Sequence, residues 1–84
     1  MPEIPRQSHT YTVVLERDLE AGGFVATCPA LPGVVTEGDT VEEAFDMARD
    51  AIRGYLESLQ KDGLPIPVER EPVVSPITVD LAKL

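Results

Sequence analysis

The stretch PALPGVVTEGDTVEEA, residues 29–44, decides the fold, because it holds a chain break, a strand and the start of a helix. Pro29 and Pro32 have no backbone N–H to donate, so the chain has to leave any sheet and turn there. The β-branched run at residues 34–37 then predicts a short strand, which Gly38 closes. The chain therefore enters a new strand directly after a break.

The last residues of the same stretch carry a strong signal for the start of a helix. Thr40 and Glu43 fit a capping box, in which the hydroxyl accepts an orphan N–H and the carboxylate reaches back. Gly63 suits the position after a helix end, so we expect a helix over about residues 40–61. Apolar residues at spacings of three and four predict one buried stripe along it: Val41, Ala44, Phe45, Ala48, Ile52, Tyr55, Leu56 and Leu59.

Two strands are predicted upstream of the break. HTYTVVLER, residues 9–17, alternates well enough for a strand, and FVATC, residues 24–28, predicts a second. DLEAGG, residues 18–23, between them has turn chemistry, so the two strands form an antiparallel hairpin. The faces expected in the core carry Tyr11, Val13 and Leu15 from the first strand and Phe24, Ala26 and Cys28 from the second.

Downstream of the helix, four prolines between residues 65 and 76 predict an extended connector. ITVDL, residues 77–81, predicts a fourth strand that either adds to the sheet edge or pairs with the same strand of another chain. The expected fold class is α+β, a three-stranded antiparallel meander followed by one long helix and the fourth strand. We expect a loose N-terminal arm over residues 1–9 and one domain over residues 10–84.

The amino-acid composition limits the classes of function that we expect. Eighty-four residues make one small domain, and seven basic against fifteen acidic side chains give a net charge of −8. Such a surface repels nucleic acids and membrane headgroups and attracts basic partners. One cysteine, Cys28, and one histidine, His9, predict neither a disulfide nor a structural zinc site. We expect no catalytic residues, metal or cofactor, and, without a targeting segment, a cytoplasmic location.

The carboxylates are the remaining candidates for function. A solvated face and an electrostatic surface for a basic protein are both open interpretations of them. Residues near the hairpin turn and along the polar side of the helix are the candidates for partner contacts: Glu16, Asp18, Glu20, Glu42, Glu43, Asp46 and Asp50.

The order of motifs resembles the HicB-like antitoxin family. The resemblance covers residues 10–67 and rests on the strand with Tyr11 and Val13, the turn to Phe24, and above all residues 29–44. It implies a β-β-β-α-β domain with a partial RNase H-like fold that lacks catalytic carboxylates. It also implies an antitoxin that covers the active site of a small basic RNA-cleaving toxin, HicA.

The chain departs from many members of that family in one respect. Few residues follow Gly63, so we expect a short form without the C-terminal DNA-binding segment, and direct nucleic-acid binding is not expected. A repressor of its own operon and a solitary vestigial RNase H-like nuclease are the alternative hypotheses. The apolar residues near the C-terminus are too many for so small a fold to bury alone, and an edge strand invites pairing, which favours a homo-oligomer, a dimer or else a tetramer.

Overall fold

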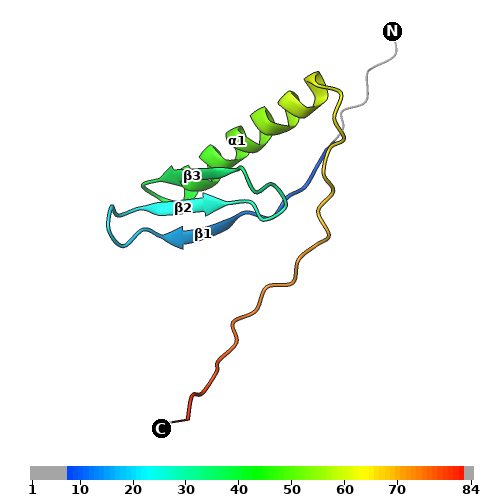
Figure 1. Cartoon of the computed structure of the whole chain (residues 1–84). Helices are drawn as coiled ribbons and strands as arrows, with labels where there is room; N and C mark the ends of the chain where they lie inside the picture. Colours follow the sequence, from blue (N-terminus) through cyan, green and yellow to red (C-terminus); the bar gives the residue numbers. More distant parts are fainter. Residues whose placement is uncertain (1–7, 83–84) are drawn as a thin grey trace.

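The computed structural model describes residues 8–82, in which three strands and one helix follow one another along the chain (Figure 1). The predicted N-terminal arm lies largely outside the described residues. The elements are β1 (Val14–Arg17), β2 (Phe24–Thr27), β3 (Val35–Gly38) and α1 (Val41–Lys61). The strands form an antiparallel sheet in the order β1-β2-β3, and α1 packs across one face of it. The predicted meander and helix are confirmed.

The first strand is shorter than predicted, because only Val14–Arg17 of residues 9–17 is β-strand. The register pairs Val14 with Thr27, and its continuation sets the residues before β1 against the loop that contains Pro29 and Pro32. Prolines donate no backbone hydrogen bond, so the ladder stops where they begin. The sequence alternation at residues 9–13 is real, but the partner strand ends before it.

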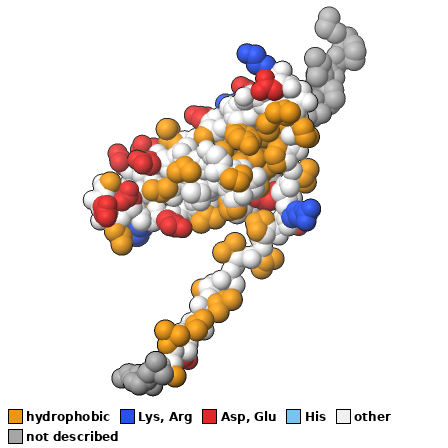
Figure 2. Space-filling model, in the orientation of Figure 1, with side chains coloured by type: hydrophobic (Ala, Val, Ile, Leu, Met, Phe, Trp, Pro, Cys, Tyr) orange, Lys and Arg blue, Asp and Glu red, His pale blue; other side chains and the backbone are white. Residues whose placement is uncertain are grey.

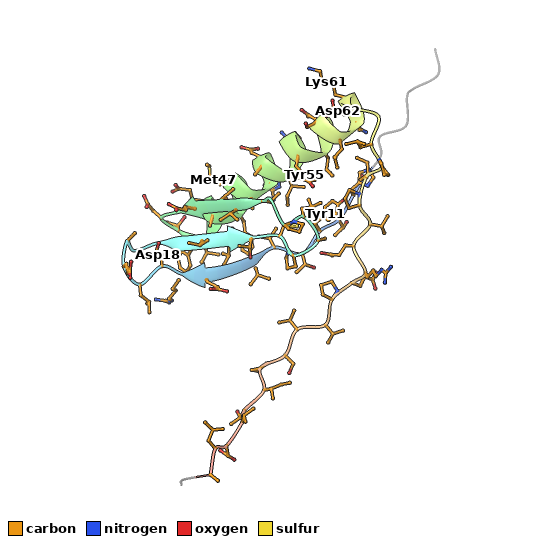
Figure 3. The ribbon with its side chains drawn as sticks, in the orientation of Figure 1. Tyr11, Asp18, Met47, Tyr55, Lys61 and Asp62 are labelled. Carbon is orange, nitrogen blue, oxygen red and sulfur yellow. The ribbon has the colours of Figure 1, made fainter. Side chains whose placement is uncertain are left out.

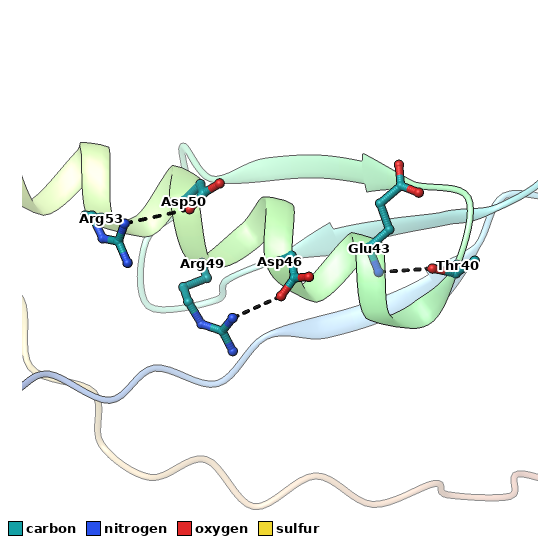
Figure 4. A network of polar contacts seen from close by, with 6 residues as sticks. All are labelled: Thr40, Glu43, Asp46, Arg49, Asp50 and Arg53. Carbon is teal, nitrogen blue, oxygen red and sulfur yellow. Dashed lines mark hydrogen bonds and ion pairs between the residues drawn. The ribbon is translucent and has the colours of Figure 1, made fainter.

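The cap of α1 is formed at its predicted residue. The Thr40 Oγ1 accepts a hydrogen bond from the Glu43 N–H at 3.0 Å. The Glu43 carboxylate points away from this cap, so only the hydroxyl half of the predicted capping box is present (Figure 4). At the other end Gly63, at a φ of 68°, donates to the Gln60 carbonyl, and Leu64 donates to that of Leu59. This pair of bonds is a Schellman motif, which ends the helix where Gly63 predicted.

The helix lies very close to β3 because the facing residues are small. Ala44 and Ala48 are fully buried and, with Ala26 of β2, form one core cluster. A Cβ built on Gly38 would lie 2.4 Å from the Ala44 nitrogen, so the sheet and the first turn of α1 meet backbone to backbone. Only glycine allows that approach.

A second core cluster lies under the loop that follows β2. Cys28, Leu31 and Val34 are buried there, and Tyr11, Ala30, Ala51, Ile52, Tyr55 and Leu56 pack against them. Cys28 is 1% exposed and without a disulfide. Its predicted role as a small buried apolar residue is confirmed.

The predicted apolar stripe of α1 is only partly buried. Phe45 is 41% exposed, and Val41 is exposed as well. The reason is the placement of α1 over β3 and β2, which leaves the face of the sheet beside β1 uncovered. The expectation that Phe45 is a core residue is wrong.

The segment after α1 is extended and leaves the body of the molecule (Figure 1). Residues 77–81 form no strand in the described part of the chain, so the predicted fourth strand does not pair within this structure. The molecule measures 71 × 28 × 22 Å, with a Cα radius of gyration of 17.1 Å. A compact chain of this length has a radius of about 12 Å. The RNase H-like relation stays a prediction.

Candidate functional site

Acidic side chains gather at the end of the sheet that carries the β1–β2 turn (Figure 2). A shallow hollow of about 280 Å³ opens there between the turn, the end of β3 and the start of α1. Four of its lining residues carry carboxylates, and we call them the acidic end: Asp18, Glu37, Asp39 and Glu43. Acidic residues of three different elements therefore line one hollow. Negative charge around it suits a cationic group of a partner.

Asp18 also holds the turn together (Figure 3). Its Oδ1 accepts hydrogen bonds from the backbone N–H groups of Glu20 at 3.1 Å and Ala21 at 3.0 Å. The left-handed backbone of Gly22 and Gly23 completes the reversal. Asp18 thus has a structural role whatever it contacts outside the chain, and a test of its charge has to keep its acceptor oxygen.

Two predicted contact residues on α1 already have basic neighbours (Figure 4). Asp46 pairs with Arg49 at 3.0 Å, and Asp50 pairs with Arg53 at 3.9 Å. All four side chains are more than half exposed, so each pair contributes little to stability. The pairs do reduce the local negative charge, which makes this side of the helix less attractive to a cation than the acidic end.

The other three predicted residues lie apart from the hollow. Glu16 on β1, Glu20 in the turn and Glu42 in the first turn of α1 are exposed. Glu37 and Asp39 belong to the acidic end but were missed by the sequence analysis. The signal that places them there is the strand register, since Gly38 pairs with Phe24 and the end of β3 therefore lies beside the hairpin turn. That these carboxylates contact a partner stays a prediction.

Cys28 and His9 are the remaining candidate groups within residues 8–82. Burial raises the pKa of the Cys28 thiol, against the lowering effect of hydrogen bonds from the Leu31 and Ala30 backbone. A raised pKa disfavours the reactive thiolate. His9 is exposed. Within the described range, no group of three or more His, Cys, Asp or Glu side chains is arranged to hold a metal ion.

The connector after α1 is tied to the segment before β1. The Tyr11 hydroxyl donates to the Pro67 carbonyl. The Thr12 N–H donates to one oxygen of the Glu69 carboxylate, and the Thr12 Oγ1–H donates to the other at 3.0 Å. These bonds fix where the chain leaves the body.

The described part of the chain is a small α+β domain with an acidic end. The sequence comparisons identify its family. Residues 11–80 match the family described as HicB-like antitoxin of the bacterial toxin–antitoxin system. This is most of the chain, and the protein belongs to the HicB-like antitoxin family.

The relatives include both short and long proteins. The chain is 42% identical over 79 residues to a UPF0150 protein of Synechocystis, covering 94% of this chain and 98% of that one. It is 47% identical over 57 residues to a UPF0150 protein of Thermoplasma acidophilum, covering 68% and 81%. Antitoxin HicB 1 of Photorhabdus laumondii is 41% identical over 73 residues, which cover 82% of this chain but only 46% of that antitoxin. Among residues 8–82, no helix has the length and apolar content needed to cross a bilayer.

Proposed function

We propose that this protein is a cytoplasmic antitoxin that binds a small, basic, RNA-cleaving toxin of the HicA type and covers its active site without performing catalysis. Membership of the HicB-like antitoxin family carries the proposal. The partner is a protein rather than DNA or RNA, because a net charge of −8 opposes binding to phosphate backbones.

The acidic end is the surface that we assign to the toxin. Its carboxylates come from a turn, a strand end and a helix start, and Glu37, Asp39 and Glu43 are exposed. A concave surface of one sign steers an oppositely charged partner and raises the association rate constant. Electrostatic attraction would bring the basic toxin to this end, and the bulk of the antitoxin would then exclude RNA from the toxin.

Neutralisation of a toxin tests the function itself. The full chain is co-expressed with a HicA-type toxin encoded beside its gene, and both growth and copurification are measured. We expect the chain to restore growth and to copurify with the toxin. If growth stays arrested while the chain is folded and abundant, the antitoxin function is wrong.

Two matched triple variants test the surface. Glu37→Gln, Asp39→Asn and Glu43→Gln remove three charges from the acidic end and leave Asp18 to hold the turn. The control, Asp46→Asn, Asp50→Asn and Glu57→Gln, removes three charges from the exposed side of α1. We expect the first variant to slow association with the toxin by about tenfold at low salt, and the control to slow it far less. Equal slowing in both would assign the effect to net charge and reject the acidic end.

A further inference from the structure

The C-terminal arm, residues 72–82, is an extended and largely apolar segment that pairs with no described strand. Five of its side chains are among the most exposed apolar groups of the described chain: Val73 96%, Val74 75%, Ile77 83%, Val79 73% and Leu81 89%. Over residues 77–81 apolar side chains alternate with Thr78 and Asp80, so an extended backbone presents one apolar face and one polar face. A segment of this kind can pair with the free edge strand of a sheet.

β1 provides an edge of that kind. It pairs with β2 on one side, and no described strand lies on the other. Asp18 donates its N–H to the Gly23 carbonyl, and inter-strand bonds involve alternate residues of an antiparallel strand. The backbone N–H and C=O groups of Leu15 and Arg17 therefore point away from β2 and are available to a further strand.

On the face of the sheet that α1 covers, the surface next to the β1 edge is partly apolar. Because α1 covers β2 and β3, a groove of about 430 Å³ remains between α1 and the segment before β1. Its apolar lining includes Val13, Phe45 and Ile52. A strand added to β1 with its apolar face toward α1 would cover the exposed part of this groove.

The arm does not return to its own body. Glu69 is bound at Thr12, and beyond it the chain runs outward without contact with β1 (Figures 1 and 3). Pro72 and Pro76 keep this part extended, because proline fixes φ and restricts the residue before it. An arm directed away from its own chain is placed to reach a second one.

We propose that two copies of this chain exchange their arms, each arm adding as a strand to the β1 edge of the other copy. The sequence already predicts a homo-oligomer, and the exchange specifies which surfaces of the two copies would pair. The proposed antitoxin function does not depend on the exchange. Val74 lies on the other face from Val73 in an extended backbone, so four apolar residues of each arm can face α1. At roughly 100 Å² for each buried aliphatic side chain, these eight residues and the surface that they cover remove about 1,600 Å² from water. This area is in the middle of the range for stable complexes, about 1,200–2,000 Å².

The test measures the mass of the full chain by light scattering and sedimentation over a range of concentrations. Ile77→Asp with Val79→Asp places charge on the apolar face of the arm, and Thr78→Asp is its control on the polar face. Arg17→Pro removes an outward N–H of β1, and Arg17→Ala is its control with that N–H retained. Circular dichroism checks that each variant is folded.

We expect the wild-type chain and both controls to be dimers, and Ile77→Asp/Val79→Asp and Arg17→Pro to raise the dissociation constant at least about 100-fold. Mixing the two defective variants should restore weak association, because one intact arm then meets one intact edge.

A monomeric wild type would overturn the exchange, whether the arm folds back or binds the toxin. Dimers in all variants would place the interface elsewhere, and loss in the arm variant alone would indicate arm-to-arm pairing. Toxin neutralisation by the monomeric variants would show that the antitoxin function stands separately.

Discussion

At the scale of single residues, the contact between Gly38 and Ala44 sets the distance between sheet and helix. A side chain at Gly38 has no space, since its Cβ would meet the Ala44 nitrogen at 2.4 Å and the Ala44 Cα at 2.7 Å. Both atoms are backbone, so relief requires α1 to move as a unit. The fold depends on the absence of a side chain at this position.

We therefore expect Gly38→Ala to lower the free energy of unfolding by about 2–3 kcal/mol. Gly54→Ala is the matched control, because a Cβ there has no neighbour within 4 Å and the residue lies in the helix interior. The control should raise the free energy of unfolding by about 0.5–1 kcal/mol. Urea unfolding followed by circular dichroism measures both, and equal stability of the two variants would contradict the close contact.

At the scale of elements, the connector after α1 is held by side chains rather than by a strand ladder. The Glu69 carboxylate binds the backbone and hydroxyl of Thr12, and Tyr11 binds the Pro67 carbonyl. Ile66 and Pro67 are half-buried, while residues 70–82 are exposed. Glu69 is thus the last firm attachment before the arm begins.

We expect Glu69→Ala to speed hydrogen exchange of the Thr12 amide by about tenfold, because that amide loses a charged acceptor. Arg70→Ala alters the neighbouring residue, which is exposed, and should leave the exchange rate unchanged. Exchange followed residue by residue in NMR spectra distinguishes the two. An unaltered Thr12 rate in Glu69→Ala would mean that the amide is protected by something other than this carboxylate.

The element scale also explains where sequence reasoning succeeded. The helix was predictable to within one residue, because Thr40 and Gly63 are local signals that act through the backbone of their own turns. The length of β1 was not, because it depends on prolines in the partner segment. The exposure of Phe45 depends on which strands α1 covers, and Glu37 and Asp39 join the acidic end only through strand register. Features set by long-range pairing were the ones missed.

At the scale of the whole molecule, two acids, the buried Cys28 and the partly buried Tyr11, link stability to pH. Burial raises the pKa of Cys28 above 9.0 and is also the main cause that raises the pKa of Tyr11 above 10.0. Negative charge at Glu69 contributes in the same direction to both. Above about pH 9 the folded chain therefore binds more protons than the unfolded chain, and the free energy of unfolding falls as pH rises.

We expect this stabilisation to be complete below pH 9.0 and to be lost as pH rises through the folded-state pKa values of the two groups. Urea unfolding from about pH 8 to about pH 10.5 measures the slope. Cys28→Ala combined with Tyr11→Phe removes both groups and should flatten the slope, whatever it does to stability at neutral pH. A slope of equal steepness in the double variant would show that other groups titrate.

The sealed position of Cys28 has a practical consequence for spectroscopy. The lone thiol of this chain is inaccessible to dyes and spin labels, so a cysteine introduced on the surface can be tagged without first replacing the natural one. Distances between probes on the body and on the far end of the chain can then be followed in otherwise unaltered protein.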